Sequence, residues 1–109
     1  MAEVVVVVLF RARPGGREDA EAAFAEMMPA THAEEGCIRF ALHRVPGDPE
    51  RFVLVERWAS RAALDEHLAA PHLAAFRARG ADIWAEPPQI TVADPLALGD
   101  AVKGTLAGA

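Results

Sequence analysis

The sequence predicts a domain of the α+β class, with an antiparallel sheet and its elements in the order β-α-β-β-α-β. Three observations predict this class. Apolar or alternating runs of strand length occur at four places, segments with apolar residues at helical spacing lie between them, and clusters of Pro and Gly separate the two kinds. The 109 residues, 52% of them hydrophobic, suffice for one compact core and are too few for a second full domain.

The first strand is expected over residues 4–10, an unbroken apolar run typical of a strand that is covered on both faces. The Pro-Gly-Gly of residues 14–16 ends it. A helix is predicted over residues 17–34, because apolar side chains recur there at helical spacing: Ala20, Ala23, Phe24 and Met27. Pro29 removes a backbone donor inside this helix, so we expect a kink or a break there. Gly36 is expected to cap the end of the helix.

Two alternating strands follow, over residues 37–45 and 51–58, and the turn formers of residues 46–50 join them. This pattern predicts a β-hairpin. The second of these strands places four residues on one face: Phe52, Leu54, Glu56 and Trp58. A carboxylate in this otherwise apolar row is a candidate functional group.

The second helical region is expected in two pieces. The first begins at the N-cap candidate Ser60 and has three residues on one side: Leu64, His67 and Leu68. Pro71 suits the first position of the second piece. The apolar face of that piece would carry Leu73, Phe76, Gly80, Ile83 and Trp84. Residues 86–88, Glu-Pro-Pro, should end it, and residues 89–93 should form the last strand.

Residues 1–95 are therefore expected to form one domain of ferredoxin-like topology, followed by a C-terminal tail over residues 96–109. The tail is rich in Gly and Ala, and we expect it to be loose or to pack on a partner. Helices can cover only one face of such a sheet. The unbroken apolar run at residues 4–9 nevertheless favours a second dry face. A homodimer that stacks sheet on sheet would supply this cover, so we expect a dimer.

Composition excludes several classes of function. The formal net charge is −5 and the cations are scattered, which argues against nucleic acid and membranes as partners. The chain has no Asn or Tyr, one Ser and one Lys, so serine hydrolase or Schiff-base chemistry has little to work with. No glycine-rich phosphate loop indicates a nucleotide cofactor. The lone Cys37 and the absence of a signal-like N-terminus favour a cytoplasmic protein with a buried, inert thiol.

Histidines are the first candidates for chemistry. His67 lies on the apolar side of its helix, where it would be either a core imidazole bonded to a backbone carbonyl or an acid or base in a pocket. His72 follows across Pro71. Glu56, His67 and His72 could converge as two histidines and a carboxylate, but their spacing matches no recognised metal motif, and we predict no metal.

Arg77 is the second candidate, because it falls within the apolar arc of its helix. It would either form a structural ion pair with Glu56 or serve as a pocket cation that holds an anionic oxygen such as a phenolate. Trp58, on the strand face of Glu56, would then be an aromatic wall of that pocket or simply part of the core.

These residues together resemble the antibiotic biosynthesis monooxygenase family, and most closely its small members related to quinol monooxygenases. The resemblance spans about residues 3–95. It rests on five short segments: Glu35-Gly36-Cys37-Ile38-Arg39-Phe40, Glu56-Arg57-Trp58, Ala63-Leu64, His67-Leu68 and Pro71-His72-Leu73. It implies a dimeric ferredoxin-like α/β barrel with a pocket between the sheet and the helices. Members include oxygenases that need no metal, flavin or haem, because the substrate anion delivers an electron to O₂.

The resemblance also implies site residues. Trp58 and Arg77 are similar to a tryptophan and an arginine that line the pocket in polyketide-oxidising members. Leu54 stands where those enzymes have an asparagine, so their mechanism does not carry over whole. Haem-degrading relatives need an asparagine and an axial histidine, whereas this chain has aliphatic residues and Arg77 at those places.

The sequence thus leads to the hypothesis of a cofactor-independent monooxygenase that oxidises a small quinol or polyphenolic aromatic with O₂. His67 would accept the phenolic proton with help from His72, and Arg77 would stabilise the anion. The expected substrate-binding residues are Trp58, Glu56, Phe76 and Leu54. An acid–base isomerase or lyase on the same fold, and a non-catalytic ligand-binding dimer, remain as alternatives.

Overall fold

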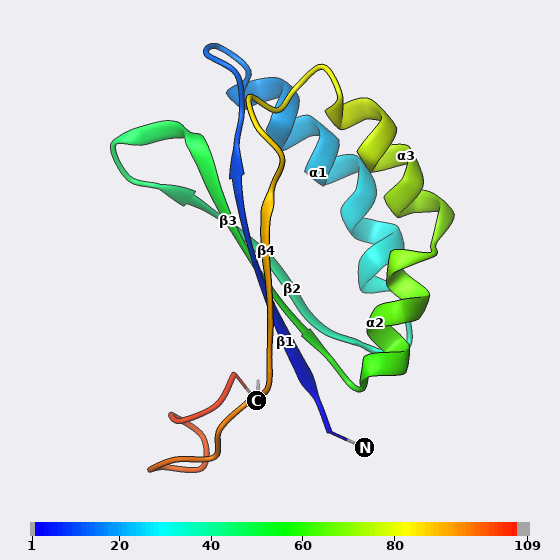
Figure 1. Cartoon of the computed structure of the whole chain (residues 1–109), viewed down its shortest axis with the longest axis vertical. Coiled ribbons are helices and arrows are strands. Elements are labelled where there is room, and N and C mark those ends of the chain that lie inside the picture. The colour runs from blue at the N-terminus through cyan, green and yellow to red at the C-terminus, as the bar shows by residue number, and fades with distance from the viewer. Residues whose placement is uncertain (1, 107–109) are drawn as a thin grey trace.

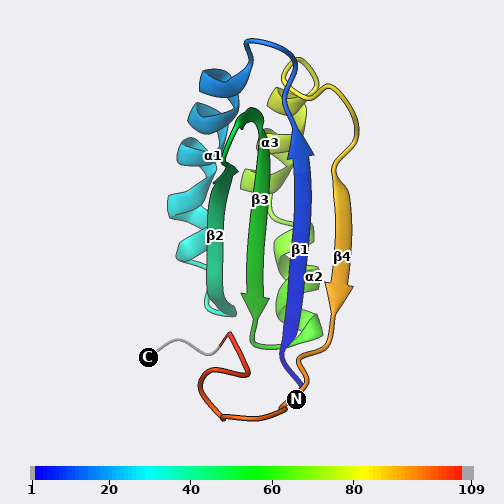
Figure 2. The same cartoon turned by 90° about the vertical axis from the view of Figure 1, so that its left-hand side faces the viewer.

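The computed structural model describes residues 2–106; Met1 and residues 107–109 of the expected tail lie outside the described residues. Four strands form one antiparallel sheet in the order β2-β3-β1-β4, and the helices lie on one face of it (Figures 1 and 2). The predicted α+β class and ferredoxin-like order are confirmed. The elements are β1 Val4–Arg11, α1 Arg17–His32, β2 Cys37–Val45, β3 Asp48–Trp58, α2 Arg61–Leu68, α3 Pro71–Gly80 and β4 Gln89–Ala93.

Strand β1 lies between β3 and β4, and its side chains alternate between two very different environments. Val6 and Val8 point toward the helices and are buried. Leu9 points to the opposite face and is 42% exposed. The expectation that both faces of this strand are dry is therefore not met within one chain, because all three helices lie on the same side of the sheet (Figure 2).

Helix α1 continues through Pro29 to His32, so the expected break does not occur. Pro29 and the carbonyl of Ala25 that it leaves unpaired both lie on the exposed side of α1, where water can satisfy the carbonyl. Gly36 does not cap the helix, since Ala33 holds that position. A Cβ atom on Gly36 would lie 2.3 Å from the Cβ of Ala63 in α2. A close approach between the two segments is what requires glycine there.

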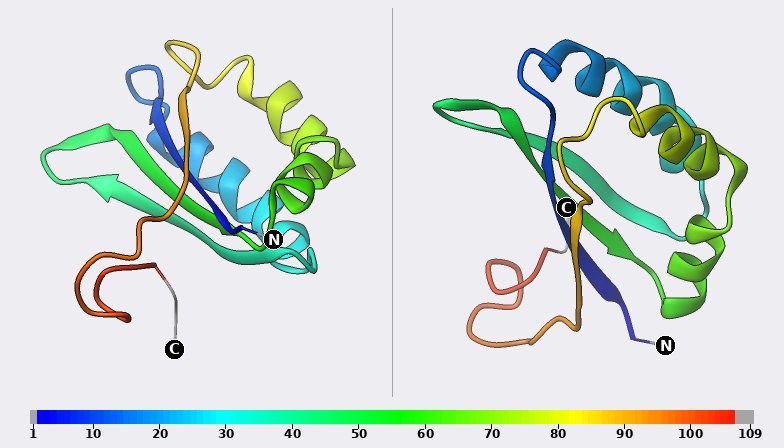
Figure 3. Two further views of the ribbon diagram at one scale, coloured as in Figure 1. Left: turned by 60° about the horizontal axis from the view of Figure 1, so that its bottom comes forward. Right: turned by 45° about the horizontal axis from the view of Figure 1, so that its top comes forward.

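The β2–β3 hairpin is tighter than expected. Strand β3 begins at Asp48, directly paired with Val45, and only Pro46 and Gly47 form the turn. Gly47 has a φ of 79°, which suits the third position of a type II turn after proline. Figure 3 shows the tip of this hairpin projecting beyond the helical layer. The register shifts between Cys37 and Arg39, so the regular alternation of β2 begins only after that bulge.

Helices α2 and α3 begin as predicted. The Ser60 side chain accepts a hydrogen bond from the Ala63 backbone at 3.1 Å, and Pro71 occupies the first turn of α3. Helix α3 ends at Gly80, earlier than expected. A Cβ atom on Gly80 would meet Nε1 of Trp84 at 2.5 Å, so the chain turns there and lets the indole fold back over the glycine.

An aromatic cluster lies between α1, α3 and β1. The rings of Phe24 and Phe76 are 4.8 Å apart, and Phe10 lies 5.1 Å from Phe24 in an edge-to-face arrangement. Trp84 packs on Phe10 at 4.8 Å. These contacts hold the two long helices over the sheet at a fixed spacing.

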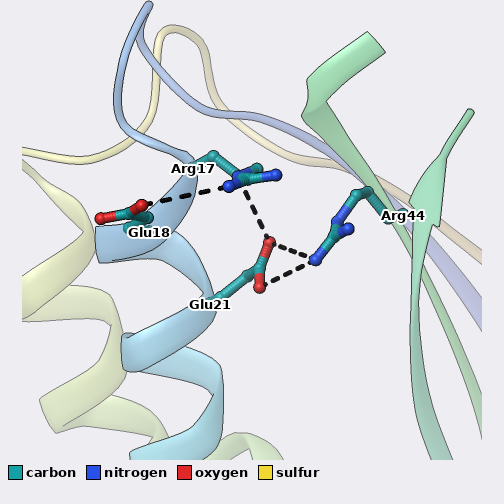
Figure 4. A network of polar contacts seen from close by, with 4 residues as sticks. All are labelled: Arg17, Glu18, Glu21 and Arg44. Carbon is teal, nitrogen blue, oxygen red and sulfur yellow. Dashed lines mark hydrogen bonds and ion pairs between the residues drawn. The ribbon is translucent and has the colours of Figure 1, made fainter. Parts of the chain in front are cut away.

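Polar contacts at the surface join α1 to the sheet. Glu21 of α1 receives Arg44 of β2 at 3.0 Å and lies 3.9 Å from Arg17, which also approaches Glu18 (Figure 4). All four side chains are substantially exposed, so this network orients the surface more than it stabilises the fold.

Residues 94–106 leave the sheet after β4 and lie away from the helices (Figure 1). Asp100 accepts hydrogen bonds from the Val102 and Lys103 backbone and so closes a turn. Leu96 and Leu98 of this segment are about 70% exposed. Among the described residues, no helix is both long and apolar enough to cross a bilayer.

Candidate active site

A cavity of about 710 Å³ lies between the helices and the sheet, within the range of small-molecule sites. Leu54 and Val8 form part of its floor because their side chains point from β3 and β1 toward the helices. Phe76 of α3 supplies an aromatic wall. The predicted pocket residues Leu54 and Phe76 therefore lie on this cavity.

The cavity is open along the edge of the sheet. Leu68, Ile90 and Val92 line it and are each more than 40% exposed. Ile90 pairs with Val8 and Val92 with Val6, so β4 continues the floor beyond the cover of the helices. The mouth therefore lies between the helices α2–α3 and strand β4, and the deep end lies under α2.

His67 lies at the deep end and is only 3% exposed. Its Nδ1 donates a hydrogen bond to Oε2 of Glu34 at 2.6 Å. Nε2 of His72 donates to the same carboxylate oxygen at 2.8 Å. His67 is thus a buried imidazole held by a carboxylate, rather than by the backbone carbonyl that we considered from the sequence.

This contact decides which nitrogen of His67 is available. An ionised Glu34 can only accept hydrogen bonds, so neutral His67 carries its proton on Nδ1. Its Nε2 then has a free lone pair, and it has no hydrogen-bond partner among residues 2–106. His67 lines the cavity, whereas Glu34 lies behind it. The arrangement is that of a general base with a carboxylate that orients it.

Trp58 lies behind the cavity wall rather than on it. It is fully buried and is absent from the lining, which corrects the expectation of an aromatic wall at this position. Its ring stacks against His67 with the centroids 4.6 Å apart. Its Nε1 donates to Oε1 of Glu56 at 2.8 Å. Trp58 therefore supports both titratable groups of the deep end.

Glu56 lines the cavity and is 5% exposed. Burial raises the pKa of its carboxyl from 4.5 to about 7; the Trp58 hydrogen bond partly opposes this shift, and the charge of Glu34 adds to it. Across the sheet, Glu56 pairs with the apolar residues Val6 and Phe40. The carboxyl is therefore poised between its neutral and charged forms near neutral pH.

Arg77 lies at the mouth of the cavity and is exposed. Within residues 2–106 it forms no ion pair with Glu56, so the structural pair considered from the sequence is absent. The apolar arc of α3 passes beside Arg77 because α3 lies at the rim, with Leu73 and Phe76 turned inward. Arg61 of α2 also reaches the cavity, while its guanidinium pairs with Asp65 at 3.4 Å.

A metal ion does not fit the cluster as it stands. The sequence suggested Glu56 with His67 and His72, whereas the ligand atoms that gather within 4.8 Å belong to Glu34, His67 and His72. Two histidines and a carboxylate suit zinc or iron. Ligand atoms around a tetrahedral zinc lie roughly 3.3 Å apart, but here the oxygen is 2.6 and 2.8 Å from the two nitrogens. These are hydrogen bonds, and the room for an ion is lacking.

The remaining candidates lie outside the cavity. His32 contacts the carbonyl oxygen of Phe40 at 2.9 Å and His43 that of Val53 at 3.3 Å, and both are exposed. Cys37 is half-buried, and desolvation, with Glu34 and Glu56 nearby, raises the pKa of its thiol to about 11. This agrees with the expected inert thiol.

Glu34 is the residue that sequence reasoning missed. The Glu34-Glu35 pair follows the last turn of α1 and has the appearance of a solvated helix end. Glu35 is exposed, whereas the Glu34 side chain is 18% exposed and faces α2. The proximity of Gly36 to Ala63 brings the two segments together, and no local pattern encodes that approach.

Comparison with known proteins identifies the family. The model of the family described as "Antibiotic biosynthesis monooxygenase" matches residues 3–79, which is more than half of the chain. The chain belongs to the antibiotic biosynthesis monooxygenase family. The resemblance inferred from the sequence is confirmed, and the matched region contains the deep end of the cavity with Glu34, Glu56 and His67.

Curated relatives point the same way. "Putative monooxygenase Rv0793" of Mycobacterium tuberculosis is 38% identical over 93 residues, which cover 85% of this chain and 91% of that protein. "Probable quinol monooxygenase YgiN" of Escherichia coli is 32% identical over 83 residues, with 67% of this chain and 80% of that protein covered.

Solved structures share the fold. The structure of Rv0793 matches with a TM-score of 0.81 at 37% identity and covers 87% of this chain and 96% of that one. Protein SO0527 of Shewanella oneidensis matches with a TM-score of 0.80 at 29% identity, with 85% and 90% covered. The uncovered part of this chain is small, and the conserved architecture is that of the sheet and the helices.

Proposed function

We propose that this protein is a monooxygenase that oxidises a small quinol or polyphenolic aromatic with O₂ and needs no bound cofactor. One observation carries the proposal: His67 presents a free Nε2 to a largely apolar cavity of about 710 Å³ while Glu34 holds its Nδ1. Deprotonation of a phenol is the step that makes such a substrate electron-rich enough to react with O₂. A relative whose name is that of a quinol monooxygenase favours this class of substrate.

His67 is the proposed base. Nε2 accepts the phenolic proton, and the imidazolium that forms remains bonded to Glu34, which stabilises its charge. His72 helps indirectly, because it bonds the same carboxylate oxygen and fixes the position of Glu34. The apolar walls exclude water, so the phenolate is not stabilised by solvent and stays reactive.

Arg77 is the proposed anion-binding residue at the mouth of the cavity. Its guanidinium has no ion-pair partner among the described residues, so it can bind a phenolate or carbonyl oxygen of a substrate that reaches the rim. Leu54 and Phe76 provide apolar contact for the ring. Leu54 supplies no hydrogen bond, so orientation falls to the polar groups at the two ends.

A homodimer is also part of the proposal. The face of the sheet away from the helices carries Val5, Val7 and Leu9, which are partly or largely exposed in one chain (Figure 2). Contact with the same face of a second copy would bury them. Stacked sheets would complete the α/β barrel that the family resemblance implies, and would bury the half-exposed valines of β1 and β3.

Oxygen uptake by purified, chelator-treated protein tests the activity. The panel contains hydroquinones, naphthoquinols and anthrones, and the control without protein measures autoxidation. We expect uptake well above the control, undiminished by chelation, and a loss of the excess when His67 is replaced by Asn. Product formation without oxygen consumption would instead identify the acid–base isomerase or lyase that the His67 and Glu56 pair could also support.

A further inference from the structure

We infer that Glu56 is a second catalytic residue, the acid that protonates the departing oxygen when the oxygenated substrate breaks down. The inference deepens the proposed function and rests on it. It extends to a substrate class: polycyclic phenols that carry a CH₂ or CH group beside the ring carbonyl, of which anthrones are the simplest. Three observations about Glu56 lead to this role.

The first observation is the lack of a counter-charge. The Glu56 side chain is buried, and its single printed hydrogen bond comes from the neutral indole of Trp58 at 2.8 Å. No cation among residues 2–106 lies within ion-pair distance of it. A buried carboxylate without a cation is strongly disfavoured, so this carboxyl keeps its proton more readily than an exposed one.

The second observation is access. Glu56 lines the cavity on the sheet side, and His67 lines it on the helix side. Trp58 joins the two, because its ring stacks on His67 and its Nε1 holds Oε1 of Glu56. Oε1 is thereby occupied, and Oε2 has no printed partner and remains for the cavity. A bound ring would lie with a base on one side and an acid on the other.

The third observation is the set of charges around Glu56. The ionisable groups that face it are Glu34 behind His67, His67 itself and, at the far rim, Arg77. The nearest fixed charge is that of Glu34, and it is negative. A negative neighbour and a dry site both favour the protonated form of Glu56, whereas the same Glu34 favours protonation of His67.

The overall reaction with an anthrone-type substrate is R₂CH₂ + O₂ → R₂C=O + H₂O. His67 takes the first C–H proton, the carbanion passes an electron to O₂, and the radical pair combines to a C–O bond. The peroxide anion takes the proton back from His67, which gives R₂CH–OOH.

Breakdown of this hydroperoxide needs both residues. His67 removes the second C–H proton, the C–H electrons form the carbonyl, and the O–O bond breaks. The departing hydroxide takes the proton of Glu56 and leaves as water. The proton on His67 then returns to Glu56, so both residues regain their starting states and no outside reductant is required.

Glu56→Gln tests the inference with a hydroxyanthrone as probe. Glutamine keeps an oxygen that accepts the Trp58 hydrogen bond, so the fold should be retained, and Trp fluorescence checks this. We expect oxygen uptake to continue while quinone release slows about 100-fold and a hydroperoxide accumulates, since general acids contribute factors of about 10² to 10⁴. Glu66→Gln, an exposed carboxyl on α2, is the matched control and should release quinone at the wild-type rate.

Two results would overturn the inference: quinone release by Glu56→Gln at the wild-type rate, or loss of oxygen uptake without hydroperoxide, which would place Glu56 before the oxygen step. A wild type that consumes no oxygen would refute the proposed function instead. An infrared titration separates the two cases without substrate. A protonated carboxyl band that is present in the wild type near pH 6 and absent from Glu56→Gln supports the acid, and a carboxylate at that pH in both proteins overturns it.

Discussion

Oε2 of Glu34 lies 2.6 Å from Nδ1 of His67 and joins the segment after α1 to helix α2. The two residues are 33 positions apart in the chain, and their contact gives the cavity its base. Without the carboxylate, His67 would be one more buried imidazole whose proton could sit on either nitrogen. With it, the lone pair faces the cavity.

Glu34→Gln should lower oxygen uptake by roughly 100-fold, because the amide can donate to Nδ1 and move the proton of His67 to Nε2. Glu35→Gln is the matched control, since Glu35 is the exposed neighbour. Nitrogen-15 NMR of the histidines measures the tautomer directly. A His67 that keeps its proton on Nδ1 in the Glu34 variant would contradict the role of this carboxylate.

His67→Asn should reduce oxygen uptake on a reactive quinol by about 10² to 10⁴, the usual contribution of a general base. The apolar cavity and Arg77 remain, so substrate binding should change little. His43→Gln on the exposed side of β2 serves as the control. Equal turnover by the His67 variant and the wild type would exclude His67 as the base.

The stability of the protein should depend on pH through Glu56. The pKa of this carboxyl is about 7 in the folded state and 4.5 as its ordinary value, so between these pH values the folded protein retains a proton that the unfolded chain releases. The free energy of unfolding should therefore fall as pH rises from 4.5 to about 7, by up to roughly 3 kcal/mol at about 1.4 kcal/mol per unit.

Urea unfolding at a series of pH values measures this slope in the wild type and in Glu56→Gln. The variant has no titrating group at this position, so the difference in unfolding free energy between the two proteins should favour the variant increasingly as pH rises across the window. A difference that stays constant from pH 4.5 to 7 would show that the buried carboxyl has an ordinary pKa.

Gly36→Ala should destabilise the protein by about 1–3 kcal/mol, the range for overpacking, because the added Cβ would lie 2.3 Å from the Cβ of Ala63. The same change should reduce activity, since it separates Glu34 from His67. Ala63→Gly removes the opposing atom, so the double variant Gly36→Ala, Ala63→Gly should regain much of the loss. Thermal unfolding of the three variants tests this, and additive losses in the double variant would argue against the contact.

Val7→Asp should convert a dimer to a monomer, because Val7 lies on the face of β1 that points away from the helices. Ala22→Asp, on the exposed side of α1, is the control and should leave the assembly unchanged. Sedimentation velocity distinguishes the two states. A wild-type protein that sediments as a monomer at all concentrations would refute the proposed dimer.

Local sequence patterns predicted most of the elements because each follows from short-range chemistry. Ser60 and Pro71 start their helices for reasons that lie within one turn, and the alternation of β3 follows from its own residues. The errors came where distant atoms decide. Helix α3 ends at Gly80 because Trp84 folds back on it, and Gly36 is needed because Ala63 approaches.

The sequence by itself determined the α+β class, the order of the elements, the family and the candidate status of His67, Glu56 and Arg77. These follow from periodicity and from polar residues on apolar faces, which any one segment reveals. Only the tertiary structure decided which residues meet. It brought Glu34 to His67, placed Trp58 behind the cavity and left Arg77 at its rim, because side-chain contacts between elements depend on the packing of helices on the sheet.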